Sequence, residues 1–187
     1  TGFTSSTQVT ADVISDLDPQ VVSSPTTRWA MDAFSDSNGY PGSVAVFDDR
    51  VYLSGVPGLP GEIWASRIGS YGDFSRSTSD EGGLHFEIQG GENCAIQWLM
   101  ALDEVLIAGT MRGEYTIESL DSTSAVSAGN IKARLRSSHG SQQGVSPINV
   151  GNSIIFTQRV GRRLREFRYE VANNQALSAD LNRLSAD

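Results

Sequence analysis

An apolar run, a polar turn of two residues and a second apolar run occur together three times along this chain of 187 residues. This arrangement is typical of a β-hairpin, in which a short turn joins two antiparallel strands. Each hairpin is followed by a further strand-like stretch that carries an aromatic residue, at Trp64, Tyr115 and Phe167. The predicted hairpins are residues 44–53 with the turn Asp48-Asp49, residues 100–109 with the turn Asp103-Glu104, and residues 148–156 with the turn Gly151-Asn152.

The hairpins recur at a nearly constant spacing. Val51, Val105 and Ile154, which anchor the returning strands, are 54 and 49 residues apart. A period of about 40 to 50 residues with several short strands in each unit is typical of β-propeller blades. The sequence therefore predicts an all-β fold, a β-propeller-like array of antiparallel blades. The three predicted repeats span about residues 40–90, 95–137 and 145–172.

The repeats fill residues 36–175, and the segments on either side have different patterns. Residues 1–35 are polar and β-branched and are broken by two X-Pro steps, so we expect a strand and a linker that continue an upstream element. Residues 176–187 place Leu177, Leu181 and Leu184 at a helical spacing, which predicts a short C-terminal helix. Roughly four to eight blades are usual in a closed propeller, so we expect the three blades to be part of a larger propeller, or an open array that partners seal.

The charge of the chain is negative and unevenly distributed. The net charge is −8, but residues 1–130 carry −13 and residues 131–187 carry +5. An acidic chain disfavours a protein that grips nucleic acid, because affinity for phosphate depends on positive charge. The asymmetry favours head-to-tail contact between acidic and basic faces of neighbouring copies. Solvated faces alone would also produce such a difference in charge.

A group of arginines in the third repeat is the strongest surface feature. Arginines there could bind phosphates, or could dock on the carboxylates of a neighbouring subunit. We interpret the group as a candidate subunit interface. Its members are Arg159, Arg162, Arg163, Arg165 and Arg168.

Adjacent carboxylates and a histidine between serines are the patterns that come closest to catalytic motifs. Asp48-Asp49 and Asp103-Glu104 both stand at hairpin tips, where Asp favours turns, and the third hairpin has Gly-Asn there. Residues 137–141 place His139 among serines, but sequence adjacency does not assemble a catalytic triad, and no strand-turn-helix nucleophile motif is present. We therefore predict no catalytic residues.

Metal, cofactor and membrane signals are equally weak. Two histidines and Cys94 do not suffice for a typical structural zinc site, and residues 36–39 begin like a calcium loop but lack its later glycine and glutamate. The glycine pairs match neither a phosphate-binding loop nor a dinucleotide fingerprint. A single cysteine forms no intrachain disulfide, and Cys94 is expected to be a small core residue. No apolar run approaches 18 residues, so we expect no membrane span.

Several short motifs follow one another in a recognisable order and spacing. They are Arg28-Trp29-Ala30, Gly39-Tyr40-Pro41, the hairpin from Val46 to Leu53, Glu62-Ile63-Trp64-Ala65-Ser66, Gly72-Asp73-Phe74, Ser137-Ser138-His139-Gly140-Ser141, Val150-Gly151-Asn152 and Gly161-Arg162-Arg163-Leu164-Arg165-Glu166. Together they resemble the tail nozzle proteins of short-tailed bacteriophages, also called tail tubular protein B. The resemblance covers about residues 26–181, and His139 occupies a position where that family tends to have an aromatic residue.

The resemblance implies a structural protein of the virion tail, assembled in the cytoplasm of a bacterial host. Its expected partners are copies of itself in a ring, the tail adaptor and other tail proteins. The ring would line the channel through which genomic DNA leaves, without binding it specifically. The resemblance implies neither a catalytic residue nor a cofactor. An acidic wall agrees with this role, because it repels phosphates.

Two other classes of function are open alternatives. One is a β-propeller module of a cellular protein that recognises a protein or a small-molecule ligand through its loops. The other is an enzyme built on a propeller, such as a glycosidase or a lyase. The enzyme is disfavoured because no loop carries a converging set of Asp, Glu, His or Tyr beyond the turn residues.

Overall fold

The structure is a computed structural model. It describes residues 2–5, 8–10, 33–77, 79–90, 94–102, 105–121, 126–160, 163–170 and 175–184. The chain divides into two compact units, residues 1–33 and residues 34–187. In the first unit, strand β1 (Gly2–Ser5) pairs antiparallel with β2 (Gln8–Thr10). Residues 11–32, which include both X-Pro steps of the predicted linker and Trp29, lie outside the described residues.

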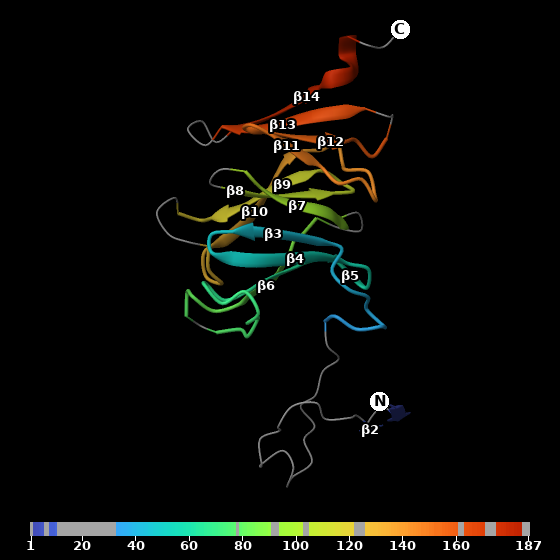
Figure 1. The fold of residues 1–187 in the computed structure, drawn as a ribbon, viewed down its shortest axis with the longest axis vertical. Coiled ribbons are helices and arrows are strands. Elements are labelled where there is room, and N and C mark those ends of the chain that lie inside the picture. The colour runs from blue at the N-terminus through green and yellow to red at the C-terminus, as the bar shows by residue number, and fades with distance from the viewer. Residues whose placement is uncertain are drawn as a thin grey trace. The chain divides into compact units, whose positions relative to one another are not determined.

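The second unit contains three four-stranded antiparallel sheets, each built from strands consecutive in the chain (Figure 1). Sheet 1 consists of β3 (Ser43–Phe47), β4 (Arg50–Val56), β5 (Leu59–Ala65) and β6 (Leu84–Glu87). Sheet 2 consists of β7 (Ile96–Leu102), β8 (Val105–Thr110), β9 (Glu114–Ser119) and β10 (Ile131–Ser137). Sheet 3 consists of β11 (Ile148–Val150), β12 (Ser153–Thr157), β13 (Leu164–Glu170) and β14 (Gln175–Asp180).

The three sheets are stacked face to face, with sheet 2 between the other two. The first strands β3 and β7 lie against each other, and so do the fourth strands β10 and β14. Val51, Val105 and Ile154 each fall within the first two residues of the second strand of their sheet. The prediction of an all-β, propeller-like array of antiparallel blades is therefore confirmed.

The first hairpin closes with a two-residue turn. Phe47 pairs with Arg50, and the two residues between them, Asp48 and Asp49, have φ angles of 50° and 53°. Positive φ at both central positions is the type I′ geometry that matches the twist of a hairpin. The interpretation of Asp48-Asp49 as a turn is therefore confirmed. Asp103-Glu104 lies outside the described residues.

The prediction of a C-terminal helix over residues 176–187 is wrong for its first half. Gln175–Asp180 forms strand β14, which pairs with β13 from Glu170↔Gln175 to Arg165↔Asp180. The open edge of β13 offers a ladder of backbone hydrogen bonds, and this tertiary pairing outweighs the spacing of the leucines. Side chains along β14 alternate between exposed and half-buried, as a strand requires. A single turn of 3-10 helix follows at Leu181–Leu184.

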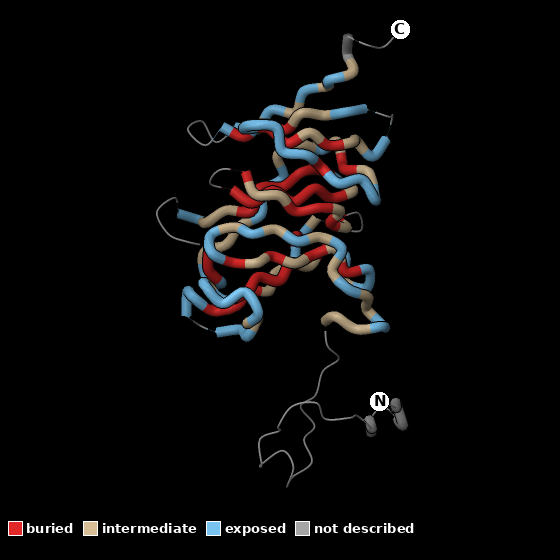
Figure 2. The backbone as a smooth tube through the Cα atoms, viewed as in Figure 1, coloured by how far each residue is buried: buried red, intermediate tan, exposed pale blue. Residues whose placement is uncertain are grey.

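Two apolar clusters hold the stack together, one on each side of sheet 2. Figure 2 shows the buried residues concentrated in the middle of the stack. The first lies between sheets 1 and 2 and includes Tyr52, Ile63, Leu106 and Ile117. The second lies between sheets 2 and 3 and includes Trp98, Ile107, Ile154, Phe156 and Phe167. Fully burying one such side chain stabilises the fold by roughly 1.5–3 kcal/mol. Every residue of β8 is buried, because sheet 2 is covered on both faces.

Arg50 is fully buried and connects β4 to the long loop between β5 and β6. Its guanidinium donates hydrogen bonds to three backbone carbonyls, those of Ser66 at 2.7 Å, Gly82 at 2.5 Å and Asp80 at 2.5 Å. Charge-assisted hydrogen bonds of this kind are stronger than neutral ones. One side chain therefore fixes both ends of a loop that has little secondary structure of its own.

We predict that Arg50→Met lowers the free energy of unfolding by about 3 kcal/mol, because the three carbonyls lose their donor. The matched control is Arg67→Met in the same loop. Arg67 makes an exposed ion pair of 3.7 Å with Glu81, so its loss should cost less than about 0.5 kcal/mol. Urea unfolding of both variants gives the two values. Equal effects would contradict the anchoring role of Arg50.

Candidate functional site

The exposed arginines of the predicted interface lie around the ends of β12 and β13. Arg159 is exposed in the loop after β12. The side chain of Arg163 is 54% exposed and lies 3.2 Å from a carboxylate oxygen of Asp180 in the same sheet. The side chain of Arg168 is 52% exposed and lies 3.0 Å from Glu166. Arg162 lies outside the described residues.

Arg165 lies on the opposite face of β13 from Arg168, in the joint between sheets 2 and 3. Its side chain is only 11% exposed. Its Nε donates a hydrogen bond of 2.9 Å to Gln158, and its Nη2 lies 3.9 Å from Asp180. The sequence cluster is therefore divided in space, and Arg165 is occupied within its own chain. Only the exposed members are placed where a neighbour could contact them.

The loop that contains His139 ties sheet 2 to sheet 3. The amide of Ser141 donates to the carbonyl of Thr110 at 2.8 Å, and the amide of Gln142 donates to Thr157 at 2.9 Å. Gly140 has a φ of 71° and packs against the backbone at Met111, so a side chain there would be strained and would collide. Residues 137–141, one of the motifs on which the family resemblance rests, thus connect the two sheets and have a structural role.

Glu114, at the start of β9, is a buried acid beneath this loop that the sequence patterns did not single out. It is fully buried and accepts hydrogen bonds from the hydroxyls of Ser137 and Ser141, the latter at 3.1 Å. Burial raises the pKa of Glu114 to about 7, although the two serines and the positive charge of Arg165 partly oppose that shift. Its position in the middle repeat, where both faces are covered, is the signal that could have identified it.

A second polar group spans the same joint, around Arg136. Arg136 donates to Glu118 at 2.8 Å and to the hydroxyl of Tyr169 at 3.2 Å, and its guanidinium lies 5.0 Å from the centre of the Tyr169 ring. Tyr169 also donates to Glu118 at 3.4 Å. Because Tyr169 belongs to sheet 3 and the other two residues to sheet 2, the group aligns the two sheets. The carboxylate of Glu118 therefore serves the packing of sheet 2 on sheet 3.

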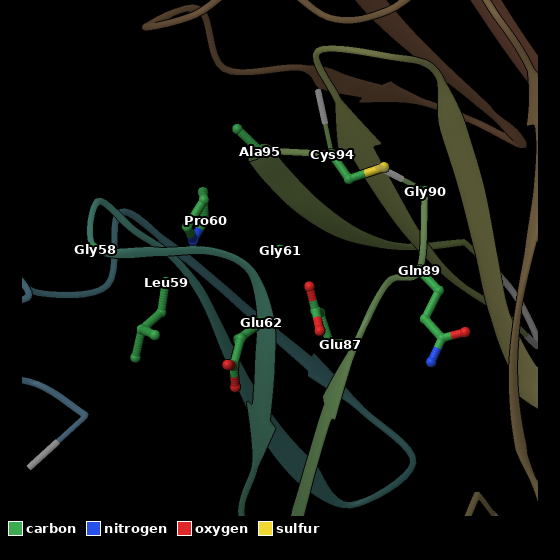
Figure 3. Close-up of a pocket in the computed structure, with 10 residues that line it drawn as sticks. All are labelled: Gly58, Leu59, Pro60, Gly61, Glu62, Glu87, Gln89, Gly90, Cys94 and Ala95. Carbon is green, nitrogen blue, oxygen red and sulfur yellow. The ribbon is translucent and has the colours of Figure 1, made fainter. Parts of the chain in front are cut away.

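An open cavity of about 760 Å³ lies beside sheet 1, where β5 begins and β6 ends (Figure 3). Glu62 and Glu87 are cross-strand neighbours at its wall, and the Cys94 thiol is directed toward Gly90. His85 is next to Glu62 and stacks on the ring of Trp64 at 5.2 Å. His85 is thus the cross-strand partner of Trp64 between β5 and β6.

Cys94 is 5% exposed, and its sulfur lies 3.5 Å from the hydroxyl of Tyr115. The expectation that it is a small core residue is confirmed. Across the described ranges, no three His, Cys, Asp or Glu side chains gather closely enough to hold a metal ion. Within those ranges, no helix has the length and apolarity to cross a membrane.

The outer faces of the stack carry exposed apolar residues. On sheet 1, Val44 is 62% exposed and Val46 is 59% exposed. On sheet 3, Ile148 and Val150 are 58% and 53% exposed and Leu177 is similarly exposed, with the ion pair of Glu166 and Arg168 on the strand between them. Scattered exposed apolar residues are common on protein surfaces, but contiguous apolar faces mark contacts with other molecules. These two faces are the surfaces of the stack best suited to a partner.

No protein-family model matches the chain, and no curated protein matches it significantly.

The raised pKa of Glu114 predicts that its contribution to the free energy of unfolding falls as the pH rises. Its pKa is about 7 in the folded protein against an ordinary value of 4.5, so folding favours the neutral acid. The resulting stabilisation is complete below pH 4.5 and is lost as the pH rises through 7, by up to about 3 kcal/mol in total. Glu114→Gln is neutral at every pH. Its stability relative to the wild type, measured by urea unfolding, should therefore increase by about 2 kcal/mol between pH 5 and pH 8.

Glu166→Gln is the control of opposite sign. The hydrogen bond from Ser153 and the charge of Arg168 lower the pKa of Glu166, so its stabilisation is present above the ordinary glutamate pKa and is lost as the pH falls. Relative to the wild type, Glu166→Gln should be less stable at pH 8 than at pH 3. A Glu114→Gln difference that stays constant from pH 5 to pH 8 would refute the buried-acid assignment.

Proposed function

We propose that this chain is a structural subunit of a bacteriophage tail nozzle, one of several copies in a ring that lines the channel for DNA ejection. The observation that carries the proposal is the stack of three sheets with an apolar outer face at each end. Exposed apolar residues on the outer faces of sheets 1 and 3 suit packing against further sheets. The resemblance of its short motifs to tail nozzle proteins supports the same role.

The use of the buried charged groups supports a mechanical role. Glu114 and Glu118 accept hydrogen bonds within the joint of sheets 2 and 3, and Arg50 is bound to backbone carbonyls. Asp48 and Asp49 form a turn. Each of these groups stabilises packing or a loop, as expected of a rigid scaffold.

The charge of the chain supports passage of DNA without capture. Neutralising phosphates requires clustered Lys and Arg, and the net charge here is −8. The exposed arginines Arg163 and Arg168 lie beside Asp180 and Glu166, which reduce their attraction for phosphate. A wall of this composition would let DNA slide past.

The proposal predicts that the protein containing this chain forms closed rings with a central opening, visible by negative-stain electron microscopy. Mass spectrometry of purified particles of the phage that encodes it should detect the protein in stoichiometric amount, because a nozzle is a permanent part of the tail. The channel wall should not retain DNA at physiological salt in a filter-binding assay. Particles without the protein would refute the proposal.

A second candidate is a binding module, and the cavity beside Glu62 and Glu87 favours it. Two carboxylates at the wall of an open cavity suit a cationic small ligand. A thermal-shift screen with polyamines and amino sugars tests this. A saturable stabilisation that is lost in Glu87→Gln and retained in Glu81→Gln, an exposed acid outside the cavity, would support the module. No shift with any of these cations would exclude this form of it.

A further inference from the structure

The hairpin registers relate the three sheets residue by residue. In each sheet, the first and second strands pair across a two-residue turn, so positions counted from that turn are equivalent. Phe47↔Arg50, Leu102↔Val105 and Val150↔Ser153 are the pairs next to the turn. Because side chains alternate along a strand, equivalent positions point to the same side of the stack. In sheet 2, one side faces sheet 3 and the other faces sheet 1, and sheets 1 and 3 have the corresponding two sides.

The outer face of sheet 3 repeats the side of sheet 2 that is covered by sheet 3. Ile148 is equivalent to Met100, and Val150 is equivalent to Leu102. Leu102 is 3% exposed in the core between sheets 2 and 3, whereas Val150 is 53% exposed. Ile155, the partner of Ile148 on the second strand, is half-buried. Sheet 3 therefore has the apolar pattern of a sheet that another sheet follows.

The outer face of sheet 1 repeats the side of sheet 2 that is covered by sheet 1. Val44 pairs with Leu53, and the equivalent pair in sheet 2 is Leu99 with Ala108. Leu99 and Ala108 are 5% and 0% exposed, whereas Val44 is 62% exposed. Sheet 1 therefore has the apolar pattern of a sheet that another sheet precedes.

We propose that two copies of the chain bind through these outer faces. The outer face of sheet 3 in one copy packs on the outer face of sheet 1 in the next copy. The contact continues the packing found between sheets 1 and 2 and between sheets 2 and 3. This inference rests on the proposed function, a ring of identical copies, and names the surfaces that meet in it. Val44 and Val46 of one copy cover Ile148 and Val150 of its neighbour.

The charges of the two ends favour this head-to-tail contact over a symmetric one. Residues 34–90, which contain sheet 1, carry eight Asp or Glu and three Arg, a net charge of −5. Residues 148–184, which contain sheet 3, carry six Arg and three Asp or Glu, a net charge of +3. Sheet 1 against sheet 1 would bring two acidic ends together, and sheet 3 against sheet 3 two basic ends. Only the mixed contact is attractive.

A head-to-tail contact is heterologous, so each copy retains one free outer face of each kind until the assembly closes. Repetition of the same rotation between copies produces a ring when it closes and a filament when it does not. Charge asymmetry and open apolar faces thus act together. The apolar faces supply the burial and the charges select the order of the copies.

Three single substitutions test the proposal. Val44→Asp places a carboxylate on the outer face of sheet 1, and Val150→Asp places one on the outer face of sheet 3. Leu120→Asp is the control, because Leu120 is 59% exposed on the middle repeat and belongs to neither outer face. Sedimentation velocity of the 187-residue chain measures association, and circular dichroism measures folding. Each face variant should weaken self-association by at least about 100-fold, whereas the control should assemble like the wild type.

An equimolar mixture of the two face variants distinguishes the order of the copies. Val44→Asp retains an intact sheet 3 face, and Val150→Asp retains an intact sheet 1 face. The mixture should form a 1:1 complex of twice the monomer mass of 20.1 kDa and nothing larger. A face variant that dimerises alone would show a symmetric contact and overturn the proposal. A monomeric wild type, or a mixture without the 1:1 complex, would also overturn it.

The same measurements separate this inference from the proposed function. If the 1:1 complex forms but phage particles lack the protein, the contact stands and the tail function fails. If particles contain the protein in rings and the face variants still assemble, the tail function stands and the contact proposed here fails.

Discussion

The fold depends on one constraint, which is that a sheet with apolar side chains on both faces must be covered on both. In sheet 2 the condition is met, and every residue of β8 is buried. Burial of roughly 25 cal/mol per Å² of apolar surface makes each covered face the main source of stability. Sheets 1 and 3 have one covered face each, and Val44 and Val150 show that the other face has the same character. The stack is thus a repeating interface with exposed apolar residues on the outer faces of sheets 1 and 3.

Apolar burial alone would not set how one sheet sits on the next, because it has little directionality. Polar groups at the joint of sheets 2 and 3 supply that information. The loop through Ser141 hydrogen-bonds to both sheets, Glu114 lies beneath it, and Arg136 joins Glu118 to Tyr169. Satisfied polar networks of this kind favour one arrangement over its alternatives. Rigidity at the joint follows from this combination of an apolar centre and a hydrogen-bonded rim.

The hairpins and their repeat could be predicted from the sequence because both are local patterns. Alternation with period two indicates a strand, and the two-residue turn at Asp48-Asp49 indicates a hairpin, without reference to distant residues. Strand β14 could not be predicted in this way, because it exists only where β13 offers an open edge, and its leucine spacing matches a helix equally well. Local pattern is informative until a partner far along the chain decides between two compatible structures.

The candidate site shows the same limit more sharply. The sequence predicts one surface for the five neighbouring arginines, but strand alternation turns Arg165 into the joint while Arg168 points outward. Arg50 and Glu114 carry no motif, because their importance arises from burial among carbonyls and hydroxyls of distant segments. Sequence spacing gives the face of a strand, but only the stacking of sheets decides which face is buried.

In an assembly of copies, force would pass through the interior joints between sheets and through the contacts between outer faces. Close-packed interiors have low compressibility and transmit strain directly. If the contact between copies repeats the contact between sheets, no step in the chain of contacts is softer than another, since Val44 against Val150 would resemble Leu99 against Phe47 within a copy. A ring made of one interface used many times resists distortion evenly around its circumference. For the conduit proposed above, such evenness would matter more than any single strong bond, because failure begins at the weakest joint.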